Sequence, residues 1–295
     1  MSNNWIGYLV APWLQFRLGV GKVVKIINNN IMLAIFLWSG VGIAQAGNDI
    51  SVLGSSTIAP AIKVAALAFY EETGIRVQVA AGGSGLGLSA VKQNKAEIGM
   101  VSRGLTESEQ RLYDYYPIAY DGIATIVNSS NSLAALEKED IRSIYSGKQK
   151  SWPANEASNS NTLMVLVKNE GRSTREIYHN FYAIDRLANN ALFVGSNAEM
   201  IALVSINKDA IGYVSIGALE RAKQLGLKIK SLPINNIAAS SENVSNGTYP
   251  MLRTLLLVTW KGKKIRQDTR KFIQFVQSSK GKNIFREKNY IPIAN

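Results

Sequence analysis

The sequence predicts an α/β fold, and three observations lead to this prediction. From residue 47 onward, short apolar runs with a strand pattern alternate with segments whose apolar residues recur at helical spacing. Short loops rich in Gly, Ser and Thr join several of the strands to the helices that follow them. Two longer apolar runs, residues 120–128 and 255–259, lie far apart in the chain and are expected to pair as neighbouring strands. This alternation is typical of sheets whose functional groups lie at the carboxyl ends of parallel strands.

The first third of this region alternates most regularly. Ile62, Ala65, Ala66 and Phe69 share one face of a predicted helix, and Gly74 is placed to end it. The strands predicted here are residues 50–53, 75–79 and 98–101, and the helices are residues 61–73 and 88–94.

The alternation continues beyond the run at residues 120–128. Phe272, Ile273 and Val276 form the apolar face of one late helix. Strands are predicted at residues 164–167 and 210–214, and helices at residues 136–145, 175–187, 198–207, 269–276 and 281–287.

The two long apolar runs predict two crossings between two lobes. Lobe one would comprise residues 47–122 and 255–295, and lobe two residues 123–254. Pockets commonly form between such lobes, so the ligand cleft is expected there, closing by a hinge motion.

Four loops carry the strongest functional signal. They contain backbone N–H groups, hydroxyls and helix N-termini, which together favour negative charge. The loops are residues 54–60, 82–87, 102–103 and 171–175. If they converge, the chain binds a small oxyanion, and phosphate is the leading candidate.

Composition limits the other classes of function. The chain contains no cysteine, which excludes disulfides, zinc–thiolate sites and a thiol nucleophile. Its net charge of +12 attracts anions of every kind, but the basic residues are dispersed and form no nucleic-acid-binding motif. We therefore predict no nucleic-acid partner, no metal site and no cofactor.

The N-terminus resembles a secretory signal peptide, assigned to residues 1–46. An apolar run begins at Ile31 and ends at Ala44-Gln45-Ala46, a small-x-small pattern that signal peptidases cleave. The run is shorter than the roughly 20 residues that a membrane span needs. A periplasmic location follows if the signal is cleaved, and an uncleaved anchor is the alternative.

The sequence contains little that would support catalysis. His179 is the single histidine, and neither a Gly-x-Ser-x-Gly elbow nor a phosphate-binding loop of the nucleotide hydrolases is present. We expect no enzymatic activity. A hydrolase that uses His179 is the weakest of the alternatives.

Several motifs resemble the phosphate-binding proteins of ABC transporters. They are Asp121-Gly-Ile-Ala with the segment 140–148 and Trp152, the segment 210–217, and Tyr249-Pro250. The resemblance runs in order through nearly the whole chain after residue 50. It implies a two-lobed type II periplasmic-binding-protein fold that captures inorganic phosphate. It also implies a monomer that delivers phosphate to the permease subunits of an ABC transporter in the membrane.

The resemblance also assigns candidate binding residues. It implies Ser56 and Thr57 from the first loop, Ser84 and Gly85 from the second, Ser102 from the third, and Ser173 and Thr174 from the fourth. Two basic side chains beside these loops, Arg103 and Arg175, are further candidates for anion contact, and the alternative is that they are surface residues or form ion pairs between the lobes. Lys168 is expected to flank the site.

The chain departs from the family pattern in two places. Arg172 and Ser173 stand where the fourth loop of the family usually has Ser-Gly. Arg103 follows Ser102, and no acidic residue stands beside it to accept a proton from phosphate. Selectivity for phosphate over sulfate is therefore open. A non-transport interaction or phosphate-sensing protein of the same fold is the alternative function.

Overall fold

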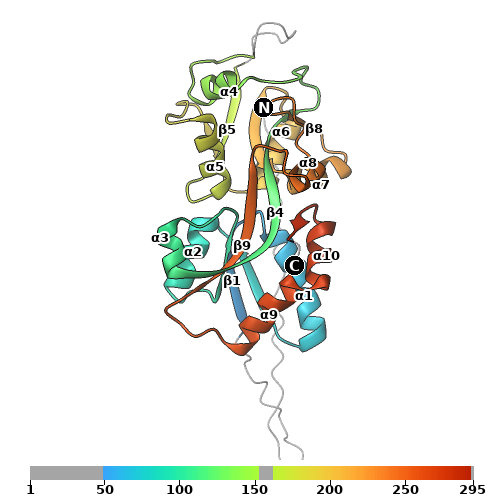
Figure 1. The fold of residues 1–295 in the computed structure, drawn as a ribbon. Coiled ribbons are helices and arrows are strands. Elements are labelled where there is room, and N and C mark those ends of the chain that lie inside the picture. Colours follow the sequence, from blue (N-terminus) through green and yellow to red (C-terminus); the bar gives the residue numbers. More distant parts are fainter. Residues whose placement is uncertain (1–48, 153–161, 294–295) are drawn as a thin grey trace, which may run out of the picture. The chain divides into compact units, whose positions relative to one another are not determined.

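The computed structural model describes residues 49–152 and 162–293, all of which belong to one compact unit, Ala46–Asn295. The predicted signal peptide, residues 1–46, lies outside the described residues. Elements are labelled as in Figure 1. The strands are β1 (Ile50–Gly54), β2 (Val77–Ala81), β3 (Ile98–Val101), β4 (Tyr113–Asn128), β5 (Met164–Lys168), β6 (Leu192–Val194), β7 (Ala210–Ser215), β8 (Ile229–Leu232), β9 (Leu252–Trp260) and β10 (Ile291–Pro292). The helices are α1 (Ala59–Thr73), α2 (Ser84–Lys92), α3 (Glu107–Leu112), α4 (Lys138–Tyr145), α5 (Ser173–Tyr182), α6 (Asn197–Ile206), α7 (Ile216–Gln224), α8 (Ser241–Ser245), α9 (Gln267–Gln277) and α10 (Ser279–Glu287).

The strands form a mixed sheet in the order β2-β1-β3-β9-β4-β7-β5-β6, with β8 and β10 also paired to β4. β1 is parallel to β2 and β3, and β5 is parallel to β6 and β7. Both parallel groups are joined through antiparallel strands, of which β4 is the longest. The predicted α/β class is confirmed.

Strand β4 connects two halves of the sheet (Figure 1). Its first part, Tyr113 to Gly122, pairs with β9, and its second part pairs with β7 and β8. The strands that contain the two long apolar runs are neighbours as predicted, but residues 255–259 pair with the part of β4 that precedes residue 120. β4 begins seven residues earlier than predicted, because the tyrosines before residue 120 continue the ladder with β9. In this register Asp121 lies directly opposite Arg253.

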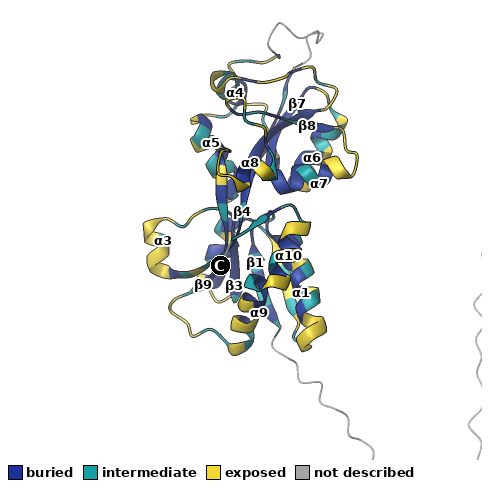
Figure 2. Ribbon diagram, turned by 45° about the vertical axis from the view of Figure 1, so that its right-hand side comes forward, coloured by how far each residue is buried: buried dark blue, intermediate teal, exposed yellow. Residues whose placement is uncertain are grey.

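Buried apolar side chains separate into two regions. One cluster draws on residues between Ile123 and Met251, and two others draw on residues 50–119 and 255–290. We call the elements around the first cluster the middle body (residues 123–251) and those around the other two the terminal body (residues 50–122 and 252–293). Figure 2 shows buried strands flanked by helices with exposed outer faces.

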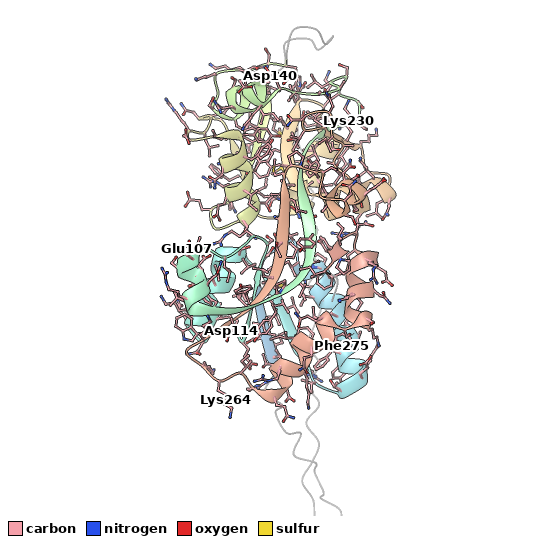
Figure 3. The ribbon with its side chains drawn as sticks, viewed as in Figure 1. Glu107, Asp114, Asp140, Lys230, Lys264 and Phe275 are labelled. Atoms are coloured by element: carbon pink, nitrogen blue, oxygen red, sulfur yellow. The ribbon has the colours of Figure 1, made fainter. Side chains whose placement is uncertain are left out.

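The terminal body has helices on both faces of its sheet. Leu255 and Leu257 of β9 pack with α1, α9 and α10, whereas Leu256 and Val258 pack with α2. This division follows the period of two in a strand, which turns successive side chains to opposite faces. Exposed charges such as Glu107 and Lys264 stand on the surface of this body (Figure 3).

Several helices begin earlier than the sequence predicts, among them α2 and α5, which begin at a Gly/Ser/Thr loop. α2 begins at Ser84 after Gly83, whose φ of 113° is costly for other residues. α5 begins at Ser173, two residues before the expected start. Each shift places Ser or Thr in the first helical turn, where backbone N–H groups are free of intrahelical partners.

Within residues 49–152 and 162–293, no helix is both long and apolar enough to cross a membrane.

Gly54 joins the first and second loops, and its substitution should be costly. Its carbonyl accepts hydrogen bonds from the N–H groups of Gly82 (2.7 Å) and Gly83 (2.9 Å). Its φ is 145°, and a Cβ there would lie 2.3 Å from the carbonyl oxygen of Met100. We expect Gly54→Ala to lower the free energy of unfolding by about 3 kcal/mol, through backbone strain and overpacking. Urea unfolding in phosphate-free buffer measures this change. Gly104→Ala, where an added Cβ meets nothing within 4 Å, is the control and should change it by less than about 0.5 kcal/mol.

Candidate anion-binding site

Three helices begin at one small cavity. The residues that line it come from the loops before α1, α2 and α5 and from the ends of β3 and β5. They are Ser55, Ser56, Thr57, Gly83, Ser84, Ser102, Lys168, Arg172, Ser173 and Thr174. Its volume is about 10 Å³. Because helix N-termini carry partial positive charge and free N–H groups, their convergence favours an anion.

A network of hydroxyl groups forms the floor of the cavity. Ser55 Oγ donates to Ser102 Oγ (2.9 Å), and the N–H of Ser102 donates to Ser84 Oγ (3.1 Å). The N–H of Thr57 donates to Ser55 Oγ (3.2 Å). These bonds fix the first three predicted loops against one another in the terminal body.

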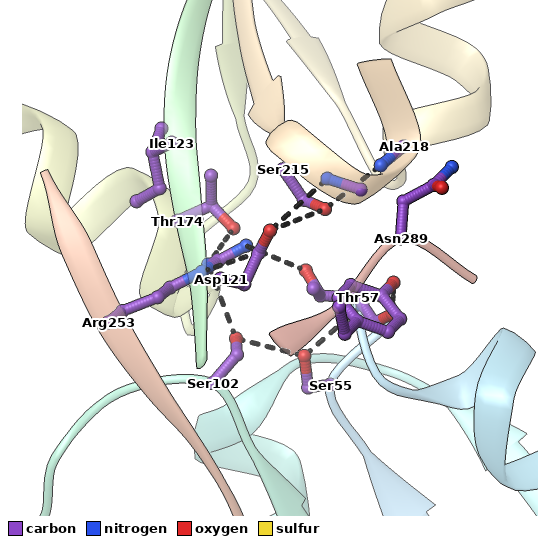
Figure 4. Close-up of polar contacts among 12 residues, drawn as sticks. Ser55, Thr57, Ser102, Asp121, Ile123, Thr174, Ser215, Ala218, Arg253 and Asn289 are labelled. Carbon is purple, nitrogen blue, oxygen red and sulfur yellow. Dashed lines mark hydrogen bonds and ion pairs between the residues drawn. The ribbon is translucent and has the colours of Figure 1, made fainter. Parts of the chain in front are cut away.

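A buried ion pair lies beside this network (Figure 4). Arg253 Nη2 is 2.7 Å from Asp121 Oδ2, and each side chain is only 1% exposed. Asp121 Oδ2 also accepts from Arg253 Nε (3.1 Å), while Oδ1 accepts from the N–H of Gly217 (3.2 Å) and from Ser215 Oγ (3.4 Å). Both oxygens of the Asp121 carboxylate therefore accept hydrogen bonds from fixed protein donors.

The guanidinium of Arg253 also joins the two bodies. Its Nη1 donates to Thr174 Oγ1 of the middle body (2.9 Å), and its Nη2 donates to Thr57 Oγ1 of the terminal body (3.2 Å). The backbone adds a second link, because the N–H of Gly85 donates to the carbonyl of Gly171 (3.1 Å). A Cβ on Gly83 would lie 2.8 Å from that same carbonyl, so this close approach requires glycine.

Two further cations line the cavity itself. Lys168 is 2% exposed, and its Nζ donates to the carbonyl of Ser196. Burial, together with the charges of Arg172 and Arg253, lowers the pKa of Lys168 to about 7. Burial also lowers the pKa of Arg172. Two cations in a closed cavity are unfavourable unless an anion neutralises them.

Two buried polar atoms at the cavity have no hydrogen-bond partner, Ser173 Oγ and Arg172 Nε. Unpaired buried polar groups cost free energy, so such atoms point to a ligand. Among the described residues that line the cavity, none is a carboxylate. No cluster of three or more His, Asp or Glu side chains in the described part of the chain is arranged to hold a metal ion.

The structure brings six of the predicted site residues to the cavity. They are Ser56, Thr57, Ser84, Ser102, Ser173 and Thr174. Gly85 lies next to the cavity without lining it, and its N–H is used in the contact with Gly171.

Arg103 and Arg175 do not line the cavity. Arg103 makes a bidentate pair with Glu109 (2.6 and 2.8 Å), and its Nε lies 3.0 Å from Glu176 on α5. The hydrogen bond to Glu109 raises the pKa of Arg103 and lowers that of Glu109. Arg175 faces Phe193 and Glu170. Arg103 thus connects the two bodies and has carboxylate partners that the sequence did not reveal.

Sequence reasoning missed Arg253 and Asp121 as site residues and placed Lys168 outside the site. A usable signal was present, because Asp121 in one of the paired apolar strands and Arg253 in the other are charges of opposite sign near the crossing. Aligning the two strands would have placed these charges together. Lys168 is the last residue of β5, and Ser102 directly follows β3. The carboxyl end of a parallel strand is the position expected for a functional residue.

His179 lies outside this cavity. Its Nε2 is 3.4 Å from Tyr213 Oη, which also accepts the backbone N–H of Lys168 (3.0 Å). His179 therefore supports the aromatic core behind Lys168, among Tyr145, Tyr178 and Tyr213.

The fold is that of a type II periplasmic binding protein. The chain belongs to the PBP superfamily, since the model of the PBP superfamily domain matches residues 41–280.

Individual relatives agree with this assignment. The phosphate-binding protein PstS of Bacillus subtilis is 27% identical over 264 residues, covering 87% of this chain and 85% of its own. A putative phosphate ABC transporter substrate-binding protein from Clostridium perfringens, solved with bound phosphate, matches with a TM-score of 0.75 and 26% identity. It covers 84% of this chain and 100% of its own. An ABC-type phosphate transport receptor from Vibrio cholerae matches with a TM-score of 0.67 and 29% identity, over 82% of this chain and 99% of its own.

Breaking the Arg253–Asp121 pair should strongly destabilise the protein. We expect Arg253→Met to lower the free energy of unfolding by about 3–5 kcal/mol, because Asp121 is left as an unpaired buried charge. The double variant Arg253→Met/Asp121→Asn should regain part of this loss, as measured by urea unfolding in phosphate-free buffer. The matched control is Lys271→Met in the exposed Lys271–Asp268 pair, with an expected cost below about 1 kcal/mol. If the effects of Arg253→Met and Asp121→Asn on the free energy of unfolding simply add in the double variant, the coupling between the two residues is contradicted.

His179 should make stability depend on pH. Burial, with the charge of Arg175, lowers the pKa of His179 to about 4, below its ordinary value of 6.5. The unfolded chain then binds the extra proton between pH 6.5 and 4, so the folded state loses stability as pH falls through that window. We expect the difference in unfolding free energy between the parent and His179→Gln to fall from pH 7 to pH 4. A difference that is constant with pH would contradict this assignment.

Proposed function

We propose that this protein is an extracytoplasmic solute-binding protein that captures inorganic phosphate and delivers it to an ABC permease. The observation that carries the proposal is the cavity, at which three helix N-termini, the basic side chains of Lys168 and Arg172 and two unpaired donors meet. The names of the relatives in Bacillus subtilis, Clostridium perfringens and Vibrio cholerae support phosphate as the ligand.

In this proposal the binding residues are the serines and threonines that line the cavity, with Lys168 and Arg172 supplying charge. Affinity comes from many hydrogen bonds to one anion held away from water. No bond of the ligand is made or broken, so the protein catalyses no reaction. Arg103 and Arg175, predicted as contacts, would act only indirectly, through the loops that they hold.

We assign the two lobes as residues 47–122 with 255–295, and residues 123–254. The separate hydrophobic clusters of the terminal and middle bodies support this division. The cavity has room for about one water molecule, less than a tetrahedral oxyanion needs. Ligand entry therefore requires the lobes to part, with β4 and β9 as the hinge.

Export through the signal peptide of residues 1–46, a monomeric state and docking to permease subunits complete the proposal. A sharp test is calorimetric titration of the protein, freed of ligand by reversible unfolding, with phosphate and then with sulfate. One-to-one binding of phosphate supports the receptor. Heat from neither anion would overturn it and favour the interaction-protein alternative.

Removing one unpaired donor should weaken phosphate binding without lowering the free energy of unfolding. Ser173 Oγ has no protein partner, so we expect Ser173→Ala to leave the free energy of unfolding in phosphate-free buffer nearly unchanged. The same variant should weaken phosphate binding about 10-fold to 100-fold, the value of one hydrogen bond to a charged group. Ser84→Ala should weaken binding too, with some loss of stability, because Ser84 Oγ also accepts from the N–H of Ser102.

The control is Ser89→Ala on the same helix α2, where the hydroxyl accepts a hydrogen bond from Gln93 and does not line the cavity. Its phosphate affinity should equal that of the parent. Unchanged affinity in Ser173→Ala would exclude this hydroxyl from the site.

A further inference from the structure

The cavity has an unusual charge balance for a site that is to bind a protonated anion. Lys168 and Arg172 line it, and no carboxylate among the described lining residues offers an acceptor for a ligand proton. Asp121, close by, has both oxygens committed to Arg253, Gly217 and Ser215. The described lining therefore offers donors and positive charge but no carboxylate acceptor, which favours the anion in its more highly charged form.

Lys168 is placed to supply positive charge to such an anion by binding a proton itself. Its Nζ can donate three hydrogen bonds and makes one that the structure fixes, to the carbonyl of Ser196. Its side chain is 2% exposed and lies at the wall of the cavity. A lysine buried beside cations loses its proton readily and regains it when an anion arrives.

The charged groups around Lys168 favour the neutral amine in the ligand-free protein. Arg172 precedes α5, Arg253 comes from β9, and the guanidinium of Arg175 lies 3.5 Å from the carbonyl of Lys168. Glu199 of α6 acts in the opposite direction and is the weakest influence. His179 sits behind Tyr213 and is neutral above pH 7. The pKa of Lys168, about 7, agrees with this arrangement.

We propose that Lys168 is the proton partner of the bound oxyanion, so that the protein takes up a proton when it binds the dianion and holds it as an ion pair with the lysine ammonium. This proposal rests on phosphate binding as the function and determines which ionic form is recognised. The proton balance is simple. Above pH 7 the proton comes from solvent and attaches to Nζ, and no bond within the anion changes.

The test is titration calorimetry with phosphate at pH 8, in HEPES and in Tris, whose heats of ionisation differ. At this pH a lysine with a pKa of about 7 is about 90% neutral in the free protein. We expect the parent protein to take up more than half a proton per phosphate bound. Lys168→Arg, which is permanently charged, should bind phosphate with almost no proton uptake. From pH 8 to pH 9 the phosphate affinity of the parent should fall nearly 10-fold, and that of Lys168→Arg should stay flat.

Binding by the parent without proton uptake, or equal uptake by Lys168→Arg, would overturn the proposal. Failure of phosphate to bind at all would instead overturn the proposed function. A second measurement requires neither phosphate binding nor a folded variant. It is side-chain NMR of the lysine Cε atoms in the ligand-free parent protein. One resonance should titrate near pH 7, and its absence would also overturn the proposal.

Discussion

The buried ion pair between Arg253 and Asp121 is the interaction on which the rest of the site depends. It lies where β9 and β4, the two strands that join the bodies, run side by side. Asp121 neutralises the guanidinium, and the remaining donors of Arg253 reach Thr57 and Thr174 on opposite sides. One residue thus orients the loop before α1 and the first turn of α5 together. Such a pair is costly to desolvate, so its role is better described as specifying geometry than as adding stability.

The site combines two sources of positive potential with different properties. The helix N-termini and hydroxyls are fixed dipoles that do not depend on pH, and they form when the helices form. Arg172 carries a full charge and Lys168 gains one when it binds a proton, and both charges are unfavourable at the cavity without a counter-charge. The fixed part favours a small anion between these loops. The titratable part determines how strongly it is held and in which ionic form.

Much of the fold could be predicted from the sequence, because it depends on local pattern. The periods of two and 3.6 identified the strands and helices around the hydrophobic clusters, and the Gly/Ser/Thr loops indicated six of the cavity residues. Short elements such as β6, β8 and α8 were missed, since they are defined by pairing and capping more than by pattern. The partners of Arg103 and the inward position of Lys168 depend on tertiary neighbours far apart in the chain, which a single sequence does not reveal.

The hydrogen bond between the N–H of Gly85 and the carbonyl of Gly171 joins the two bodies through main-chain atoms alone. No exchange of side-chain chemistry deletes it, apart from a proline at position 85, which removes the donor. The cations and hydroxyls around the cavity can therefore vary during evolution while the bodies still meet in the same register. This main-chain link between the bodies does not depend on the side chains that determine ligand preference, whereas the links through Arg253 and Arg103 do depend on side chains.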